Sequence, residues 1–150
     1  QYTPLRWGIL GAGGIAHRFC SDVKPLSDHT LQAVGSRDQA KADKFADEFG
    51  ITSRHDSYEA LVSDPEVDVI YVATPHNFHK EHALLAIHAG KAVLCEKPFT
   101  INLAEAEEVI NAAREKGVFL MEGMWSRCFP VMAKAREVVN AGEIGRPRLL

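Results

Sequence analysis

An α/β fold, with a doubly wound parallel sheet of about six strands and helices on both faces, is predicted by three features of the sequence. Short apolar runs alternate with helical patterns along the whole chain, as in a parallel sheet wrapped by crossover helices. The runs at 69–72 and 92–95 do not alternate polar with apolar residues, which is typical of central strands covered on both faces. The chain has 150 residues, 46% of them hydrophobic, which is enough for one core, so residues 1–150 are interpreted as one domain.

The expected elements follow the chain in alternation. The strands are predicted at Leu5–Leu10, Leu31–Ser36, Ser53–His55, Asp68–Ala73, Ala92–Cys95 and Val118–Met121. The helices are predicted at Ile15–Lys24, Asp38–Phe49, Ser57–Val62, Phe78–Ala89, Leu103–Lys116 and Val131–Ala141. The run at 146–150 resembles the start of another strand.

Several helix ends carry their own signals. Four helical runs are followed by a glycine, where a left-handed cap is common, at Gly50, Gly90, Gly117 and Gly142. Asn102 stands three residues before Glu105, which is the spacing of a capping box. Asn77 is the expected cap of the helix that follows it.

Charge and cysteine content limit the class of function. A net charge of −3 indicates neither a nucleic-acid nor a membrane surface, so we expect a small-molecule partner. The cysteines Cys20, Cys95 and Cys128 are odd in number and widely spaced, which disfavours both a disulfide framework and a metal site. The apolar run Leu5–Leu10 is too short for a signal peptide, so a cytoplasmic location is expected.

A glycine-rich turn directly follows the first strand. Gly11, Gly13 and Ala16 form a G-x-G-x-x-A fingerprint, with Gly14 and Ile15 between them. In a Rossmann fold the first glycine permits the turn, the second lets the backbone approach a pyrophosphate, and the small residue lets the helix pack closely. Glycine turns of this kind also occur in methyltransferases. The position at the first strand of six favours a dinucleotide.

The second strand ends without the acidic residue that NAD enzymes usually place there. Ser36 stands at that position, and Arg37 can stack on adenine while pairing with a 2′-phosphate. NADP is therefore the expected cofactor, with NAD still possible. The alternative is that Arg37 is a solvated residue beside Asp38, the cap of the next helix. Both interpretations can hold together.

Two further polar segments follow strands four and five. Ligands of open parallel sheets bind beyond the carboxyl ends of the strands, so residues 73–79 and 95–98 should flank one crevice. The glycine turn, the A-T-P-x-x-x-H segment ending at His79 and the E-K-P segment at Glu96 together resemble the Gfo/Idh/MocA oxidoreductases. The segment 121–130 resembles the branch of dimeric dihydrodiol dehydrogenases and NADP-dependent D-xylose dehydrogenases, although Cys128 stands where that branch tends to carry an aromatic residue.

The resemblance implies roles for particular residues. Lys97 matches the catalytic lysine of the family, and His79 matches a position near nicotinamide and substrate. Pro98 is expected to form a cis peptide that aims Lys97, and Glu96 to orient the lysine or contact a ribose. The other residues expected around the cofactor after strands four and six are Thr74, Pro75, His76, Asn77, Trp125 and Arg127. For Trp125 and Arg127, a docking role is an equal alternative.

The function implied is hydride transfer between nicotinamide and a secondary alcohol of a sugar or diol. In this family a mostly antiparallel substrate domain follows, and we interpret it as absent from these 150 residues. The chain alone should therefore bind cofactor with little turnover, and apolar residues around Trp125, Phe129 and Val131 should favour a homodimer. The alternative is a cofactor-binding module without catalysis, either an isolated domain or a dinucleotide-sensing regulator.

Overall fold

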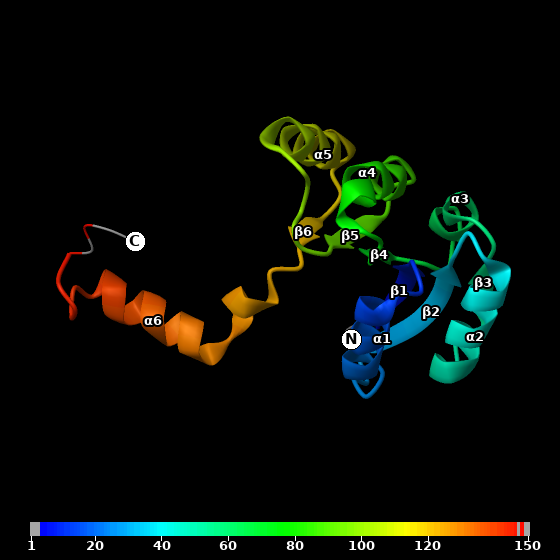
Figure 1. Ribbon diagram of the computed structural model, residues 1–150, viewed down its shortest axis with the longest axis horizontal. Coiled ribbons are helices and arrows are strands. Elements are labelled where there is room, and N and C mark those ends of the chain that lie inside the picture. The colour runs from blue at the N-terminus through cyan, green and yellow to red at the C-terminus, as the bar shows by residue number, and fades with distance from the viewer. Residues whose placement is uncertain (1–3, 147, 149–150) are drawn as a thin grey trace.

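A six-stranded sheet forms the centre of the protein, for which a computed structural model describes residues 4–146 and 148. The strands are β1 (Leu5–Leu10), β2 (His29–Gly35), β3 (Ser53–His55), β4 (Val69–Val72), β5 (Ala92–Cys95) and β6 (Leu120–Glu122). Their order is β3-β2-β1-β4-β5-β6, and all neighbouring pairs are parallel (Figure 1). This is the doubly wound Rossmann order. Strands β2 and β3 are added on one side of β1, and β4, β5 and β6 on the other, so the order of the strands reverses between β1 and β4. The predicted fold class is confirmed.

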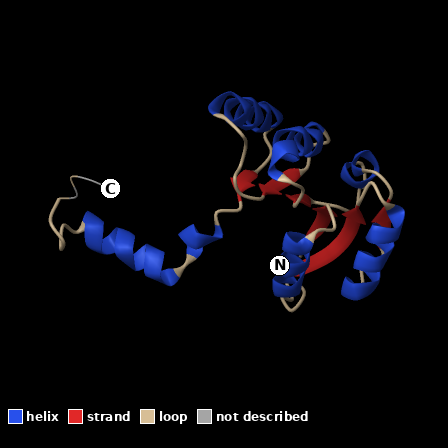
Figure 2. Cartoon of the chain, in the orientation of Figure 1, coloured by secondary structure: helices blue, strands red, loops and turns tan. Residues whose placement is uncertain are grey.

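Five helices pack on the two faces of this sheet (Figure 2). These are α1 (Gly14–Val23), α2 (Gln39–Phe49), α3 (Tyr58–Val62), α4 (His79–His88) and α5 (Leu103–Lys116). The described residues also form a further helix, α6 (Pro130–Asn140), and the 3-10 turns η1 (His76–Phe78) and η2 (Trp125–Cys128). Buried residues of α1 and α2 join one core cluster, and those of α3, α4 and α5 join the other. The central strands supply both clusters by alternation, which explains why β4 is apolar throughout.

Helix α6 departs from the prediction that all helices cover the sheet. It extends away from the sheet beyond β6 (Figure 1), and none of its described residues is buried. Its apolar side chains remain in solvent, with Val131 69% exposed and Met132 43% exposed. The sheet face over β6 on the α1 side is correspondingly open, since Met121 is 43% exposed. The expectation of helices on the faces of the sheet is therefore confirmed for α1 to α5 and wrong for α6.

The helix ends confirm most of the predicted caps. Gly50 and Gly117 cap α2 and α5 in the left-handed region, at φ of 74° and 65°. Asn102 caps α5 by accepting from the backbone N–H of Glu105 at 3.0 Å. Asn77 is a correction, because it lies inside η1 and α4 begins two residues later. The strand expected at 146–150 falls largely outside the described residues.

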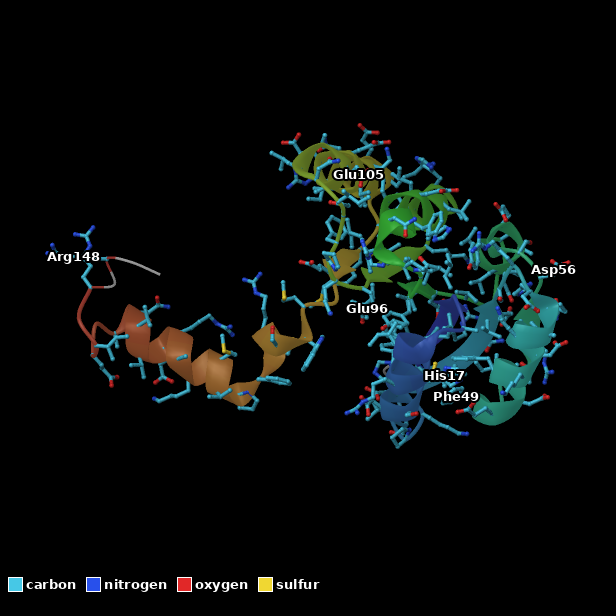
Figure 3. The ribbon with its side chains drawn as sticks, in the orientation of Figure 1. His17, Phe49, Asp56, Glu96, Glu105 and Arg148 are labelled. Carbon is cyan, nitrogen blue, oxygen red and sulfur yellow. The ribbon has the colours of Figure 1, made fainter. Side chains whose placement is uncertain are left out.

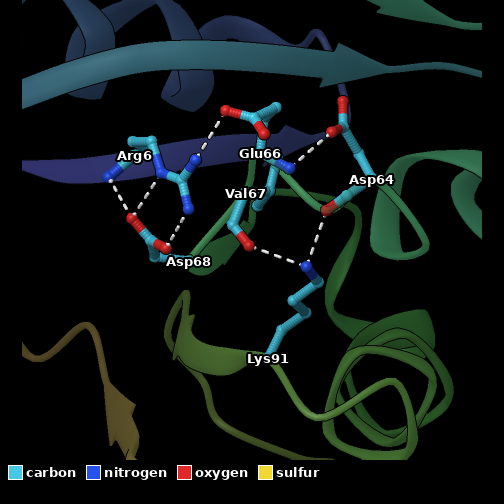
Figure 4. Close-up of polar contacts among 6 residues, drawn as sticks. All are labelled: Arg6, Asp64, Glu66, Val67, Asp68 and Lys91. Carbon is cyan, nitrogen blue, oxygen red and sulfur yellow. Dashed lines mark hydrogen bonds and ion pairs between the residues drawn. The ribbon is translucent and has the colours of Figure 1, made fainter.

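The amino-terminal edge of the sheet is held by a polar cluster (Figure 4). Arg6 donates to both carboxylate oxygens of Asp68, with Nη2 at 2.7 Å and Nε at 2.9 Å, and these bonds lower the pKa of Asp68. Lys91 Nζ donates to the backbone carbonyls of Asp64 and Val67 at 2.6 and 2.7 Å. The cluster fixes the starts of β1, β4 and β5, at the edge opposite the glycine turn.

Candidate dinucleotide-binding site

A groove of about 360 Å³ lies at the carboxyl edge of the sheet, where β1, β2 and β4 end. Its lining consists of Gly11, Ala12, Gly13, Ser36, Arg37, Lys41, Tyr58, Ala73, Thr74 and Pro75. The structure therefore brings together the glycine turn, the end of β2 and the start of the A-T-P segment. These three segments are distant in sequence, and the strand order places β1 between β2 and β4.

The two glycines of the turn have different physical roles. Gly11 has a φ of +101°, and an added Cβ would lie 3.0 Å from Thr74 Cγ2, so both conformation and space require glycine. Gly13 is extended, and a Cβ built there would meet no described atom within 4 Å. Because Gly13 also lines the groove, a side chain there would project into its open space.

The start of α1 suits an anion. Gly13 caps the helix, Gly14 and Ile15 are exposed, and Ala16 is fully buried against the sheet. The first turn carries no acidic residue, and its free N–H groups give the helix end a partial positive charge. The residues present thus fit a pyrophosphate at this turn.

The segment from the end of β2 to the first turn of α2 carries two cations, Arg37 and Lys41, and a buried hydroxyl, that of Ser36. Ser36 is buried and its Oγ accepts from the N–H of Asp38 at 3.2 Å. Asp38 in turn caps α2, accepting from the N–H of Lys41 at 3.3 Å, so the predicted cap and a groove-lining Arg37 occur together. Lys41 was missed by the sequence analysis. Its signal is a cation in the first turn of the helix that follows β2.

A second hollow of about 260 Å³ adjoins the end of β2 and shares Arg37 and Tyr58 with the groove. Its aromatic lining is Tyr58, Phe78 and His82, and its acidic residues are Asp56, Glu59 and Glu81. Burial lowers the pKa of His82, so this imidazole is neutral at pH 7. A flat, uncharged ring system with hydrogen-bond donors matches such a lining.

The residues that follow β4 lie partly on the surface and partly in the interior. Pro75 lines the groove, whereas His76 and Asn77 are exposed on η1. His79 is only 1% exposed, with Nε2 2.9 Å from the carbonyl oxygen of Thr74 and Nδ1 2.8 Å from that of Pro98. His79 therefore joins the loops after β4 and β5, with both ring nitrogens engaged inside the protein.

The loop after β5 presents Lys97 and Pro98 to solvent. Lys97 is exposed and precedes Pro98 in a cis peptide bond, as the sequence analysis predicted. Glu96, labelled in Figure 3, is buried and accepts from the hydroxyl of Tyr71 at 2.6 Å. The N–H of Phe99 donates to Glu122 of β6 at 3.0 Å. Contacts from neighbouring elements thus fix the loop that carries Lys97.

Trp125 and Arg127 lie on η2, outside the lining of the groove. Trp125 is 58% exposed and packs edge-on against Phe129, with ring centroids 5.3 Å apart. The carbonyl of Arg127 accepts from Arg136 of α6 at 3.2 Å. Of the predicted cofactor residues after the strands, the structure gathers Ser36, Arg37, Thr74 and Pro75 in the groove. The remaining ones lie outside its lining, namely His76, Asn77, Glu96, Lys97, Pro98, Trp125 and Arg127.

In the part of the chain that the structure describes, no group of three or more histidine, cysteine or acidic side chains is arranged to hold a metal ion. Within residues 4–146 and 148, no helix is both long and apolar enough to span a membrane.

The strand order and the glycine turn beside the reversal point define a dinucleotide-binding Rossmann domain. The model of an oxidoreductase family with an NAD-binding Rossmann fold matches residues 5–124, and the chain belongs to this Gfo/Idh/MocA family.

Among curated proteins, the chain is 50% identical over 147 residues to trans-1,2-dihydrobenzene-1,2-diol dehydrogenase of Mus musculus. It is 44% identical over 156 residues to the D-xylose 1-dehydrogenase (NADP(+)) of Hypocrea jecorina. The matches cover 97% and 96% of this chain but 44% and 40% of those proteins, so the chain spans less than half of their length.

Solved structures agree with the fold. A mutant of a 3-ketoreductase from Actinomadura kijaniata, in complex with TDP-benzene and NADP, superposes with a TM-score of 0.89 at 33% identity. The match covers 97% of this chain and 45% of that one. Apo scyllo-inositol dehydrogenase from Lactobacillus casei gives a TM-score of 0.88 at 22% identity over 97% of this chain and 44% of that one, which supports the fold alone.

Proposed function

We propose that this chain is the NADP-binding domain of an oxidoreductase that transfers hydride between nicotinamide and a secondary alcohol of a sugar or diol. One observation carries the proposal: a single groove joins the Gly11–Gly13 turn to Ser36, Arg37 and Lys41. A serine and two cations at the end of β2 suit a 2′-phosphate, whereas an acid there would suit the free ribose hydroxyls of NAD. Relatives named for NADP or for diol oxidation support the same assignment.

The order of the strands supports one orientation of the cofactor. The start of α1 after β1 would hold the pyrophosphate, and Ser36, Arg37 and Lys41 after β2 would hold the 2′-phosphate. Arg37 and Tyr58 of the second hollow would hold the adenine. His76, Asn77 and Lys97, which follow β4 and β5, would then hold the nicotinamide.

The bound nicotinamide supplies the hydride acceptor, and the chain's residues handle the proton. Lys97 is exposed at the end of β5, where its amine can hydrogen-bond to a substrate hydroxyl and take the proton as the C–H bond breaks. Glu96 orients this lysine by accepting from the N–H of Lys97 at 3.1 Å. His79, predicted as catalytic, acts by holding the loop, because its contacts to Thr74 and Pro98 bury both nitrogens.

Substrate contacts come from residues beyond this chain. We propose that a substrate domain follows residue 150, supported by relatives more than twice as long as the chain. Trp125 and Arg127 line the substrate side in that assembly. For the 150 residues alone, the apolar side chains of α6 drive a homodimer.

A reducing, cytoplasmic location is part of the proposal. Cys20 and Cys95 lie in separate core clusters, and burial raises the pKa of each thiol to about 12, so neither is poised for disulfide exchange. A small-molecule partner, rather than nucleic acid or a membrane, fits the net charge of −3. A cofactor-binding module without catalysis is the second candidate, favoured by the exposure of Lys97 in this chain.

Calorimetric titration of the purified chain with NADPH, NADH and adenosine 2′,5′-bisphosphate tests the proposal. We expect NADPH to bind at least about tenfold more tightly than NADH, a difference of about 1.4 kcal/mol. The bisphosphate should bind measurably, since it carries the 2′-phosphate and adenine. Equal affinities for NADPH and NADH would overturn the assignment to NADP, and absence of binding by all three would overturn the function.

A further inference from the structure

The buried carboxylate of Glu96 has hydrogen-bond donors but no counter-ion. Oε1 accepts from the hydroxyl of Tyr71 at 2.6 Å, and Oε2 accepts from the backbone N–H of Lys97 at 3.1 Å. Both oxygens therefore accept a hydrogen bond from the protein, one from a side chain and one from the backbone. Within the described residues, no lysine, arginine or histidine lies within ion-pair distance of Glu96. Burying a carboxylate without a cation costs free energy, and a positively charged group bound nearby would offset that cost.

Tyr71 fixes the position of the Glu96 carboxylate through its hydroxyl. The tyrosine is 1% exposed on β4, and Phe19 of α1 stacks on its ring with centroids 3.9 Å apart. Burial, together with the bond to Glu96, raises the pKa of Tyr71, so the phenol remains a donor at every physiological pH. Its ring cannot turn away without leaving the stack, which fixes the direction of the hydroxyl toward Glu96.

The backbone of Gly123 packs closely beside Glu96. A Cβ built on Gly123 would lie 3.5 Å from Glu96 Oε1 and 3.3 Å from the carbonyl oxygen of Cys95. The N–H of Gly123 donates to that carbonyl at 2.6 Å, so the backbone after β6 runs close to the loop after β5. The carboxylate is thus fixed at the end of β5, next to the strand end that the proposed nicotinamide crosses.

We propose that Glu96, positioned by Tyr71, is the counter-charge for the cationic pyridinium ring of the oxidised cofactor and makes the site discriminate NADP⁺ from NADPH. The ring carries a positive charge in NADP⁺ and none in NADPH, whereas the adenine and phosphate contacts are the same for both. A fixed negative charge near the ring therefore stabilises only the oxidised form. The inference rests on the proposed function, since it requires nicotinamide at the ends of β4 and β5.

The test is the ratio of dissociation constants for NADP⁺ and NADPH in the wild-type chain, Glu96→Gln and Tyr71→Phe. Glu96→Gln removes the charge at constant volume, and we expect it to weaken NADP⁺ about tenfold relative to NADPH. Tyr71→Phe should act in the same direction by about threefold, because the carboxylate loses one of its two donors. A merely structural role for either residue would weaken both forms equally.

Two controls separate this inference from the proposed function. Glu66→Gln is a matched substitution at the opposite edge of the sheet and should leave the ratio unchanged. Adenosine 2′,5′-bisphosphate lacks nicotinamide and should bind all variants alike. An unchanged ratio in Glu96→Gln, with bisphosphate binding intact, would overturn this inference and leave the cofactor assignment standing. Absence of bisphosphate, NADP⁺ and NADPH binding by the wild type would overturn both. If Tyr71→Phe lowers stability, the Glu96→Gln result decides alone.

Discussion

The guanidinium carbon of Arg37 lies 5.6 Å from the centroid of the Phe78 ring. This contact joins the residue after β2 to the 3-10 turn after β4, and both residues line the second hollow. A cation over an aromatic face is stabilised by about 0.5–1 kcal/mol at an exposed site, which is enough to restrict the rotamers of a long side chain. Arg37 is thus ordered beside the groove by the protein itself.

Because the Arg37 side chain is held beside the groove, we predict that Arg37→Ala weakens NADPH binding by about tenfold to a hundredfold. This is the range expected for the loss of one or two charge-assisted hydrogen bonds. NADH binding should change little, because NADH has no 2′-phosphate. Titration calorimetry at fixed ionic strength measures both constants. Lys41→Ala should act in the same direction but less, since its ammonium lies 3.5 Å from Asp38 and is partly neutralised.

Arg18→Ala is the matched control, because Arg18 is an exposed cation on α1 paired with Asp22. It should leave both affinities unchanged. An equal loss of NADPH and NADH affinity in Arg37→Ala would mean that Arg37 contacts adenine without reading the 2′-phosphate.

The two glycines of the turn predict separable outcomes. Gly13→Val places a side chain in the open groove where no described atom lies within 4 Å of the new Cβ, so Tm should be nearly unchanged while NADPH binding falls at least about tenfold. Gly11→Ala instead forces a side chain to adopt a φ of +101° and should lower stability by at least about 1 kcal/mol. Differential scanning fluorimetry and titration of the same samples distinguish the two. Unchanged binding in Gly13→Val would place the phosphates elsewhere.

The sequence predicted the sheet better than its surroundings. β1, β3, β5 and α5 have the predicted bounds, because glycines, caps and polar segments interrupt the apolar pattern at each end. β2 begins two residues earlier than expected, at His29, since pairing with Leu5 of β1 extends it and pairing is not a local property. Helix α6 has a clear amphipathic pattern, but the pattern does not say which surface it packs against.

The candidate site was predictable where a single segment defines it. The glycine turn and Arg37 carry their signals in sequence, and the structure places both in one groove. Lys41 was missed because its role depends on the first turn of α2 facing the groove. The bond from Tyr71 to Glu96 joins residues 25 apart in sequence, and a tyrosine inside a buried strand gives no local sign of its partner.

Arg6 supports a prediction on pH dependence. Hydrogen bonds from Arg6 hold the pKa of Asp68 below its usual value, so this contribution to stability is present above the unfolded pKa of about 3.9 and is lost as pH falls through the folded value. Arg6→Ala should therefore lower Tm at pH 7 and change it much less near pH 2. Thermal melts across this range measure the difference. A Tm deficit that persists undiminished at pH 2 would assign the effect to packing of the arginine stem.

Substitution of His79 should lower the stability of the protein and not only its catalytic activity. Both ring nitrogens of His79 lie within 2.9 Å of a carbonyl oxygen, one of Thr74 and one of Pro98, so the ring joins the loops after β4 and β5. His79→Ala should cost about 2–4 kcal/mol, since it leaves a cavity and removes the ring that contacts both carbonyl groups. Urea unfolding measures this cost. His82→Ala is a comparison on the same helix. A stability equal to wild type in His79→Ala would show that His79 does not hold the two loops together.

The exposed apolar side chains of η2 and α6 should drive self-association of the chain. Trp125, Val131 and Met132 are 58%, 69% and 43% exposed, and burying such apolar side chains drives association in water. A two-fold symmetric dimer buries the same apolar side chains of both copies against each other, so the 150-residue chain should form a concentration-dependent homodimer. Val131→Asp introduces a charge among these side chains and should shift the protein toward monomer by about tenfold or more in dissociation constant. Because no described residue of α6 is buried against the sheet, Tm and NADPH affinity extrapolated to low protein concentration should remain at the wild-type values. Sedimentation equilibrium over a range of concentrations measures the association, with Lys134→Asp as a control because Lys134 is a charged residue of the same helix. A wild-type chain that stays monomeric at all concentrations would show that the apolar side chains of α6 do not drive self-association.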